Sequence, residues 1–153
     1  MTSQVEEIAQ KLNIVHQRIG EAAVRRGRNA AQVEVVIVTK TQPVELVEAV
    51  IQAGGTILGE NYPEEAVEKI NNLRHRYPHV QWHMIGHLQS RKSAIVVEHF
   101  DMMHSLDSLR LAERMNRQLM EAGKRMPVLL EMNVSGEETK GGWKAWVERQ
   151  WKK

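Results

Sequence analysis

The fold of this chain is decided by the stretch Val33–Lys40, VEVVIVTK, a run of mostly β-branched residues that ends in a single lysine. A strand that is apolar on both faces is typical of a parallel sheet covered on both sides. In parallel α/β proteins, functional groups gather where strands end and the following loops begin. Lys40 is therefore the first candidate for a functional residue, and a solvated loop lysine is the alternative interpretation.

Length and composition favour one ordinary globular domain over residues 1–153. Hydrophobic residues make up 42% of the 153 residues and charged residues 26%, which is normal usage for a folded soluble protein. The net charge is only +2, and the basic residues are dispersed and do not form one concentrated patch. No nucleic-acid partner is therefore expected.

Cysteine usage and hydropathy bear on the compartment. The absence of cysteine excludes disulfides and cysteine-ligated zinc and fits a reducing compartment. No signal-peptide pattern or bilayer-length apolar run is present, so we expect a cytoplasmic protein without a membrane partner.

Strand patterns and helix patterns alternate along the chain. Ser3 and Glu6 have capping-box spacing and begin a leading helix that runs from about residue 3 to residue 27. The predicted strands are Val33–Lys40, Thr56–Leu58, Gln81–Ile85, Phe100–His104 and Pro127–Val134. The predicted helices begin at Pro43, Pro63 and Arg91, follow the capping loop Ser105–Ser108, and end with a helix marked by Trp143, Trp146, Val147 and Trp151.

This alternation predicts a parallel sheet, either open and doubly wound or closed as an eight-stranded barrel. A full barrel takes about 250 residues, so five of its eight strand-helix units would occupy roughly 156. An open five-stranded sheet fits the same length. Composition and spacing therefore leave both architectures open.

The loop sequences together carry a resemblance. They are Val38–Thr41 (VTKT), Gly59–Tyr62 (GENY), Trp82–Lys92 (WHMIGHLQSRK), His104–Ser108 (HSLDS) and Asn133–Lys140 (NVSGEETK). In order and spacing the chain resembles the pyridoxal phosphate homeostasis proteins from Val33 to about Trp151. It departs from the usual family pattern at Thr39, at Leu58 and at Gly142-Trp143.

The resemblance implies a (β/α)8 TIM-type barrel like the alanine racemase N-terminal domain, with pyridoxal 5'-phosphate (PLP) as cofactor. It implies that Lys40 carries PLP as a Schiff base and that Asn61 lies beside the cofactor. It further implies that His83, Ile85, Ser105 and Asn133 line or support the pocket. No catalytic residue and no metal ligand are expected.

The resemblance also implies a missing part. Family members continue for three more strands and carry there a Ser-Met-Gly-Met-Ser loop and an Arg-Ile-Gly segment that hold the phosphate. This chain reaches Lys153 without them, so we expect a barrel truncated after its fifth unit. An open sheet edge and an apolar patch then predict self-association.

Two other interpretations concern chemistry-bearing side chains. His83, His87 and His104 invite a metal site, but a spacing of four places two histidines on one face only in a helix, and here a strand and a loop are predicted. Glu60 is interpreted as a loop hydrogen-bonder and Asp107 as a helix cap, not as an acid-base pair.

Three functional hypotheses follow. The first is a carrier that binds PLP without turnover and passes it to PLP-dependent apoenzymes, as the resemblance implies. The second is a racemase-like PLP enzyme, which needs an acid-base group opposite the lysine, usually a tyrosine; Tyr62 and Tyr77 are the only tyrosines. The third is a truncated remnant that no longer binds cofactor.

Overall fold

The computed structural model describes residues 3–139 and 141–144. It begins with the long helix α1 (Gln4–Arg25), in which the Ser3 side chain accepts from the Glu6 backbone N–H while the Glu6 side chain accepts from the Ser3 backbone N–H. Gly27, just past the helix, has a φ of 63°, the left-handed conformation that glycine adopts most easily at a helix end. The predicted start and end of this helix are thus confirmed.

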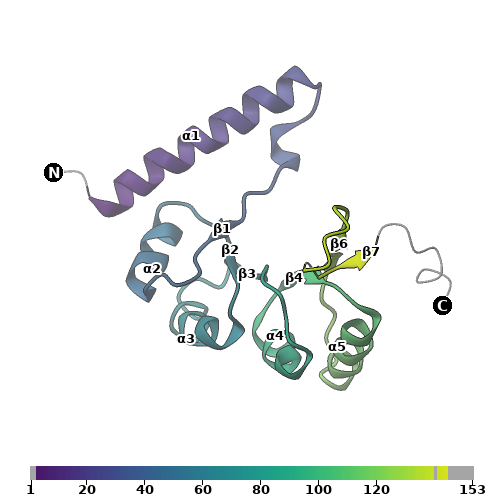
Figure 1. The fold of residues 1–153 in the computed structure, drawn as a ribbon. Coiled ribbons are helices and arrows are strands. Elements are labelled where there is room, and N and C mark those ends of the chain that lie inside the picture. Colours follow the sequence, from purple (N-terminus) through teal and green to yellow (C-terminus); the bar gives the residue numbers. More distant parts are fainter. Residues whose placement is uncertain (1–2, 140, 145–153) are drawn as a thin grey trace.

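Five parallel strands form one sheet in the order β1-β2-β3-β4-β5. The strands are β1 (Ile37–Val38), β2 (Ile57–Glu60), β3 (Gln81–Met84), β4 (Met102–Leu106) and β5 (Val128–Leu130), and the helices between them are α2 (Val44–Gln52), α3 (Pro63–Leu73), α4 (Ser93–His99) and α5 (Leu109–Glu121). Figure 1 shows these four helices in a row on one side of the strands, with α1 apart from the row. An unbroken strand order with its helices on one side is the arrangement of a barrel wall, since a doubly wound sheet reverses its order at a switch point.

The main core lies between the sheet and this row of helices. Leu58, Trp82 and Met84 are fully buried there and pack in one cluster with Val47 of α2 and Ile70 of α3. Because side chains alternate between the two faces of a strand, the residues between them point to the opposite face, which would be the interior of a closed barrel.

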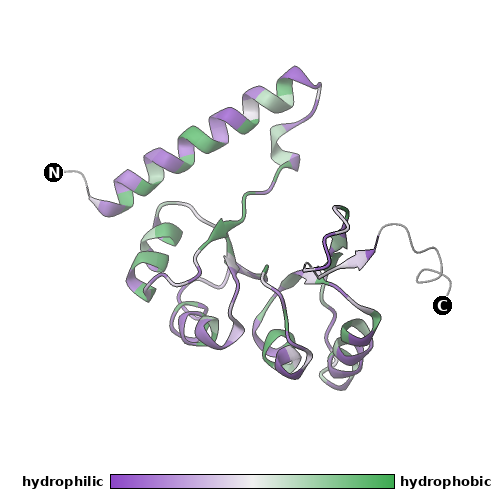
Figure 2. Ribbon diagram, viewed as in Figure 1, coloured by the Kyte–Doolittle hydropathy of each residue, from purple (hydrophilic) through white to green (hydrophobic). Residues whose placement is uncertain are grey.

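The first strand is shorter and less covered than its sequence predicts. Only Ile37–Val38 pair as β1, after a short 3₁₀ helix η1 (Ala30–Gln32), and Val38 is 51% exposed. The prediction that both faces are covered is therefore wrong for the described residues, because no described element covers the inner face at Val38. Figure 2 shows β1 as a green, hydrophobic segment nevertheless.

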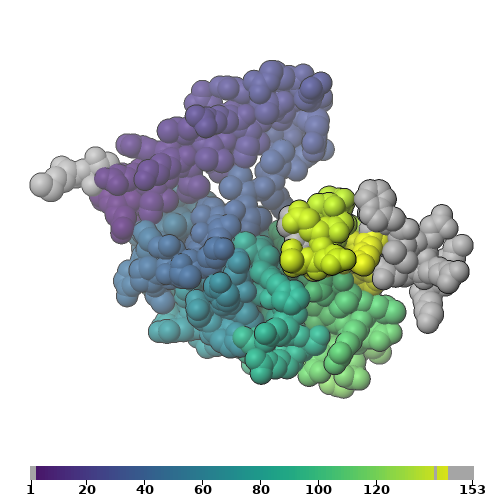
Figure 3. All heavy atoms as spheres, in the orientation of Figure 1, coloured from purple at the N-terminus to yellow at the C-terminus, as the bar shows by residue number. Residues whose placement is uncertain are grey.

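The predicted strand Pro127–Val134 is divided at Glu131. The Glu131 N–H donates to the Leu106 carbonyl oxygen, and the Glu131 carbonyl oxygen accepts from the Trp143 N–H. The chain then enters β6 (Met132–Asn133), which pairs in parallel with β7 (Trp143–Lys144). Figure 3 shows this yellow segment lying against the teal and green part of the molecule.

The last predicted helix is wrong at its start. Trp143 lies in β7, where its indole N–H donates to the Leu106 carbonyl oxygen at 2.9 Å. That bond and the pairing with β6 fix Trp143 in extended conformation. Trp146, Val147 and Trp151 lie outside the described residues.

Other boundaries move by a few residues. The strand predicted over Thr56–Leu58 is β2 and extends to Glu60. The helix predicted over Arg91–Glu98 is a 3₁₀ turn, η2 (Ser90–Lys92), followed by α4. The fourth strand extends to Leu106, so Ser105 belongs to the strand and Ser108 alone caps the next helix. Within the described residues, no helix is both long and apolar enough to cross a bilayer.

Candidate functional site

The carboxyl ends of β1, β2 and β3 bring the first predicted site residues into one row. Val38 pairs with Gly59, and Gly59 pairs with His83. Beyond these pairs, the Thr39 N–H donates to the Gly59 carbonyl oxygen and the Ile85 N–H donates to the Glu60 carbonyl oxygen. Lys40, Asn61 and Ile85 therefore lie at the carboxyl ends of three neighbouring strands.

Lys40 occupies a strained turn. The Gln42 N–H donates to the Thr39 carbonyl oxygen at 3.2 Å, which closes a four-residue β-turn with Lys40 and Thr41 in its centre. Thr41 has a φ of 61°, a conformation that is a genuine outlier for a β-branched residue. Lys40 is exposed, and its amine makes no hydrogen bond or ion pair within the described part of the chain.

Beneath this turn lies a buried polar network. Glu60 is fully buried on the helix side of β2, and its Oε1 accepts from the Thr39 hydroxyl at 2.7 Å and from Lys69 Nζ at 2.8 Å. Lys69 Nζ also donates to the Thr39 carbonyl oxygen at 2.8 Å. Glu60 is a hydrogen-bonder as predicted, but its predicted loop location is wrong, because it ends a buried strand and is half of a buried ion pair.

His83 is on the inner face of β3, two residues before Ile85 and on the same side of the strand. Its Nδ1 is 3.0 Å from Nε2 of His104 on β4, and its Nε2 is 3.2 Å from the Gln81 side-chain oxygen. Burial lowers the pKa of His83 below its usual value and the positive potential of His104 lowers it further, against weaker opposing effects of Asp101 and Glu34. The neutral imidazole is therefore favoured at this position.

Two glycines allow the loops of the site to approach closely. A Cβ on Gly86 would lie 2.5 Å from the Asn61 carbonyl oxygen, and one on Gly59 would lie 2.8 Å from Cδ1 of Ile85. Both distances are too short for real atoms, so any other residue at either position would displace Asn61 or Ile85.

Ser105 and Asn133 have structural partners. The Ser105 hydroxyl donates to the Gly86 carbonyl oxygen at 2.6 Å and thereby holds the loop that faces Asn61. Asn133 organises its own loop, because its side chain accepts from the Gly136 N–H and donates to the Glu137 carbonyl, both at 2.9 Å. The structure thus places Ser105 in support of the row of site residues and Asn133 at the end of β6, where its side chain holds the loop that follows.

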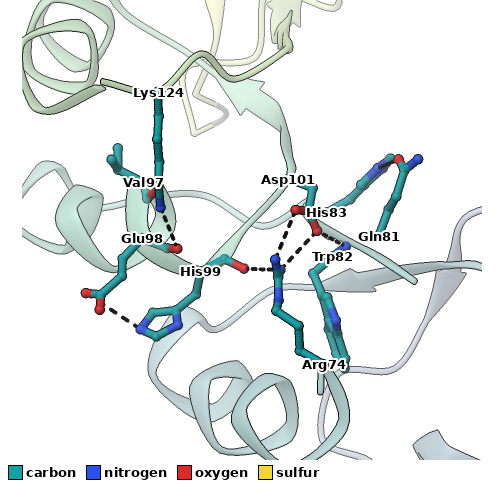
Figure 4. Close-up of polar contacts among 9 residues, drawn as sticks. All are labelled: Arg74, Gln81, Trp82, His83, Val97, Glu98, His99, Asp101 and Lys124. Carbon is teal, nitrogen blue, oxygen red and sulfur yellow. Dashed lines mark hydrogen bonds and ion pairs between the residues drawn. The ribbon is translucent and has the colours of Figure 1, made fainter. Parts of the chain in front are cut away.

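The opposite ends of the strands are joined by another charged cluster, shown in Figure 4. Arg74 after α3 contacts both carboxylate oxygens of Asp101, at 3.2 and 3.0 Å, and also donates to the His99 carbonyl. Asp101 in turn accepts from the Trp82 N–H at 2.8 Å. This cluster joins α3 to the starts of β3 and β4, away from Lys40.

Asp107 caps no helix with its own side chain. Its carboxylate lies 3.1 Å from Nδ1 of His87 and accepts from the Ser108 hydroxyl, while Ser108 accepts from the first turn of α5. The interpretation of Asp107 as the helix cap is therefore wrong by one residue, because the cap of α5 is Ser108. Within the described ranges, no three histidine or acidic side chains are grouped to hold a metal ion.

Sequence reasoning missed the buried role of Lys69. Its signal is periodicity: Lys69 is three residues after Ala66 and four before Leu73, both fully buried, so all three share the buried face of α3. A lysine on that face needs a buried acidic partner. The carboxylate at the end of the preceding strand, Glu60, supplies it.

The fold and this row of residues now define a class of protein. Residues 18–150 match the family model described as alanine racemase, N-terminal domain. The chain therefore belongs to the alanine racemase N-terminal domain family, and the predicted barrel type is confirmed.

Particular relatives narrow the comparison. The chain is 40% identical over 135 residues to the pyridoxal phosphate homeostasis protein of Haemophilus influenzae, an alignment that covers 88% of this chain and 57% of the relative. It is 39% identical over 139 residues to the protein of the same name from Escherichia coli K12, covering 90% and 59%. The predicted resemblance to this group is confirmed, and the chain spans less than two thirds of the length of these relatives.

Solved structures of similar proteins have the same fold over most of this chain. PipY of Synechococcus elongatus, with PLP bound, matches with a TM-score of 0.67 at 35% identity, over 82% of this chain and 58% of that one. An unknown protein from Bifidobacterium adolescentis matches with a TM-score of 0.83 at 35% identity, over 91% and 60%.

Proposed function

We propose that this chain binds pyridoxal 5'-phosphate through Lys40 and takes part in PLP homeostasis as a carrier without turnover. The observation that carries the proposal is the placement of Lys40: its amine has no partner among the described residues, and its turn lies at the carboxyl end of β1, next to the strand end that carries Asn61. A relative with this fold has been solved with PLP bound, and other relatives are named for PLP homeostasis.

The inner face offers chemistry that fits the cofactor. PLP supplies an aldehyde, which a lysine amine can attack only when the amine is unprotonated. Asn61 offers an amide at the neighbouring position, Ile85 an apolar surface, and His83 a neutral ring held by His104. We propose Lys40 and Asn61 as the residues that bind PLP, with His83, Ile85 and Ser105 supporting them. For Asn133 we propose an indirect role, in which its side chain holds the loop that follows β6.

A racemase-like activity is the alternative, and the two tyrosines do not favour it. Tyr77 donates to Glu48 and accepts from Gln52 on the helix side of the sheet. Tyr62 precedes α3 and is about half exposed. Tyr77 is thus engaged away from the inner face, and no side-chain hydrogen bond among the described residues holds Tyr62 in place as a second acid-base group.

The first experiment adds PLP to the purified chain, records the visible spectrum, reduces with borohydride and maps the adduct by mass spectrometry. We expect a visible band and an adduct on Lys40, both lost in Lys40→Met and both kept in Lys11→Met, which removes an exposed lysine on α1. No band, or label scattered over surface lysines, would overturn the proposal.

A second experiment separates carrier from enzyme. The loaded chain should restore activity to a PLP-dependent apoenzyme, and chain carrying Lys40→Met should not. Sustained interconversion of L- and D-alanine by the loaded chain would contradict the carrier and favour the racemase alternative.

The proposal includes self-association and a cytoplasmic location. Self-association is supported by β5, the last strand of the sheet, whose three residues Val128–Leu130 are all exposed. The cytoplasmic location is supported by the absence of cysteine from the sequence.

A further inference from the structure

The ion pair between Lys69 and Glu60 is buried, and its place in the interior needs a physical explanation. Both side chains are almost fully buried, at 7% and 0% exposure. Removing two charges from water is costly, and a buried pair is often no more stabilising than apolar residues of the same size. A role in holding one specific local conformation would account for a pair in this place.

The conformation that the pair holds is the turn of Lys40. The Thr39 carbonyl oxygen closes that turn by accepting from the Gln42 N–H, and the same oxygen accepts from Lys69 Nζ. The Thr39 hydroxyl is held by Glu60. Thr39 is therefore fixed through two of its polar groups at the residue that precedes Lys40.

The turn requires such support. Thr41 is held at a φ of 61°, and a non-glycine residue stays in this conformation only where its surroundings enforce it. A charge-assisted hydrogen bond to the closing carbonyl is stronger than a neutral one. Lys69 thus stabilises the turn from a rigid helix on the far side of the sheet.

We propose that Lys69, together with Glu60, is a positioning residue that holds the Thr39–Gln42 turn and so directs the Lys40 amine to the inner face for reaction with PLP. This inference rests on the proposed function for the role of Lys40. Lys69 touches no cofactor in this scheme and acts only through the Thr39 carbonyl.

The test removes both charges together, because Lys69→Met alone would leave an unpaired buried carboxylate. The double variant Lys69→Met/Glu60→Gln keeps side-chain size and removes the donor to Thr39. The matched control is Arg74→Met/Asp101→Asn, which removes the ion pair at the opposite ends of the strands. Near-UV circular dichroism and urea unfolding establish that each variant is folded.

The first measurement needs no cofactor. Amide hydrogen exchange at Gln42 reports on the bond that closes the turn, and we expect exchange at least about tenfold faster in the Lys69/Glu60 variant and unchanged in the Arg74/Asp101 control. Unchanged Gln42 exchange in the folded Lys69/Glu60 variant would overturn the proposal.

The second measurement is the rate of PLP labelling at Lys40, trapped with borohydride, relative to Lys11 in the same sample. We expect this ratio to fall at least about tenfold in the Lys69/Glu60 variant and to stay at the wild-type value in the control. An unchanged ratio would overturn the positioning role. If wild-type chain shows no preference for Lys40 while Gln42 exchange still depends on Lys69, the proposed function fails and the support of the turn remains.

Discussion

Nδ1 of His83 lies 3.0 Å from Nε2 of His104, so two imidazole rings on neighbouring strands share one hydrogen bond. Their planes are tilted by 49° and their centroids are 5.0 Å apart. One ring must donate while the other accepts, and therefore the ring that accepts is neutral. Protonating both rings breaks this bond and places two positive charges side by side.

This pair predicts a loss of stability in mild acid. The pKa of His83 is lowered in the folded chain, so the unfolded chain binds more protons once the pH falls below about 6.5, the ordinary histidine pKa. The free energy of unfolding should thus be highest above about pH 7 and decrease as the pH falls through 6.5 toward the lowered pKa. One proton corresponds to a slope of at most about 1.4 kcal/mol per pH unit.

Urea unfolding between pH 7.5 and 5 measures this slope. His83→Gln should flatten it, because the titrating ring is gone, whereas His75→Gln should not, since His75 is an exposed residue after α3. Equal slopes in His83→Gln and wild type would contradict a contribution from the pair.

Gly86→Ala tests the close approach of the two site loops. The new methyl group would lie 2.5 Å from the Asn61 carbonyl oxygen and 2.7 Å from its Cα, and backbone atoms have little freedom to move aside. We expect a loss of about 1–3 kcal/mol in the free energy of unfolding and a weaker PLP band, because Asn61 is displaced.

Gly20→Ala is the matched control for that substitution. Gly20 is inside α1 with nothing within 4 Å of an added Cβ, so alanine there should raise stability by up to about 1 kcal/mol. A Gly86→Ala chain as stable as wild type would show that the two loops separate easily.

The sequence predicts the order of the elements well, because it depends on local signals. Helix ends are fixed through hydrogen bonds and backbone angles within a few residues: by Ser3 with Glu6 and Gly27 at α1, by Pro43 before α2, and by Pro63 as the first residue of α3. The resemblance carried by the loops adds the barrel type, which alternation alone leaves open.

What the sequence does not predict depends on contacts between distant residues. At the break, the Glu131 N–H donates to Leu106 of β4 and the Glu131 carbonyl accepts from Trp143 of β7, and no local sequence pattern predicts this change of partner. The spacing of Lys69 from Ala66 and Leu73 indicates a buried lysine, but it does not identify its partners Thr39 and Glu60, which are 30 and 9 residues away. The placement of the Lys40 turn next to the strand end that carries Asn61 depends on the pairing of β1 with β2, which the sequence implies only through the family.

Thr41 offers a test of strain at the turn. A β-branched residue at a φ of 61° is strained by about 1–2 kcal/mol. Glycine adopts this angle freely but loses about 0.5–1 kcal/mol in backbone entropy. Glycine also lacks the Thr41 hydroxyl, which donates to the Lys40 carbonyl. Thr41→Gly should therefore lie within about 1 kcal/mol of wild type.

Thr41→Val is the comparison, since it keeps the branched Cβ and loses the hydroxyl that donates to the Lys40 carbonyl at 2.6 Å. It should be less stable than wild type by about 1 kcal/mol. Urea unfolding of the three chains gives the order, and a Thr41→Gly chain less stable than Thr41→Val would rule out relief of strain as the dominant effect.

The edge strand β5 makes the last prediction. Leu129 is 48% exposed and is the middle residue of a strand that pairs on one side only with β4 in the described part of the chain. Beside it, Met115 and Leu119 of α5 line an apolar groove of about 400 Å³. An unpaired strand edge next to apolar surface favours pairing between chains, so wild-type chain should scatter light as a species larger than its mass of 17.6 kDa.

Leu129→Lys should shift the distribution toward the monomer, because a charge on an edge strand opposes pairing. Val24→Lys changes an equally apolar residue of α1 that is 76% exposed, and it should leave the distribution as it is. A monodisperse wild-type monomer, or an equal shift in both variants, would show that β5 is not the surface through which chains associate.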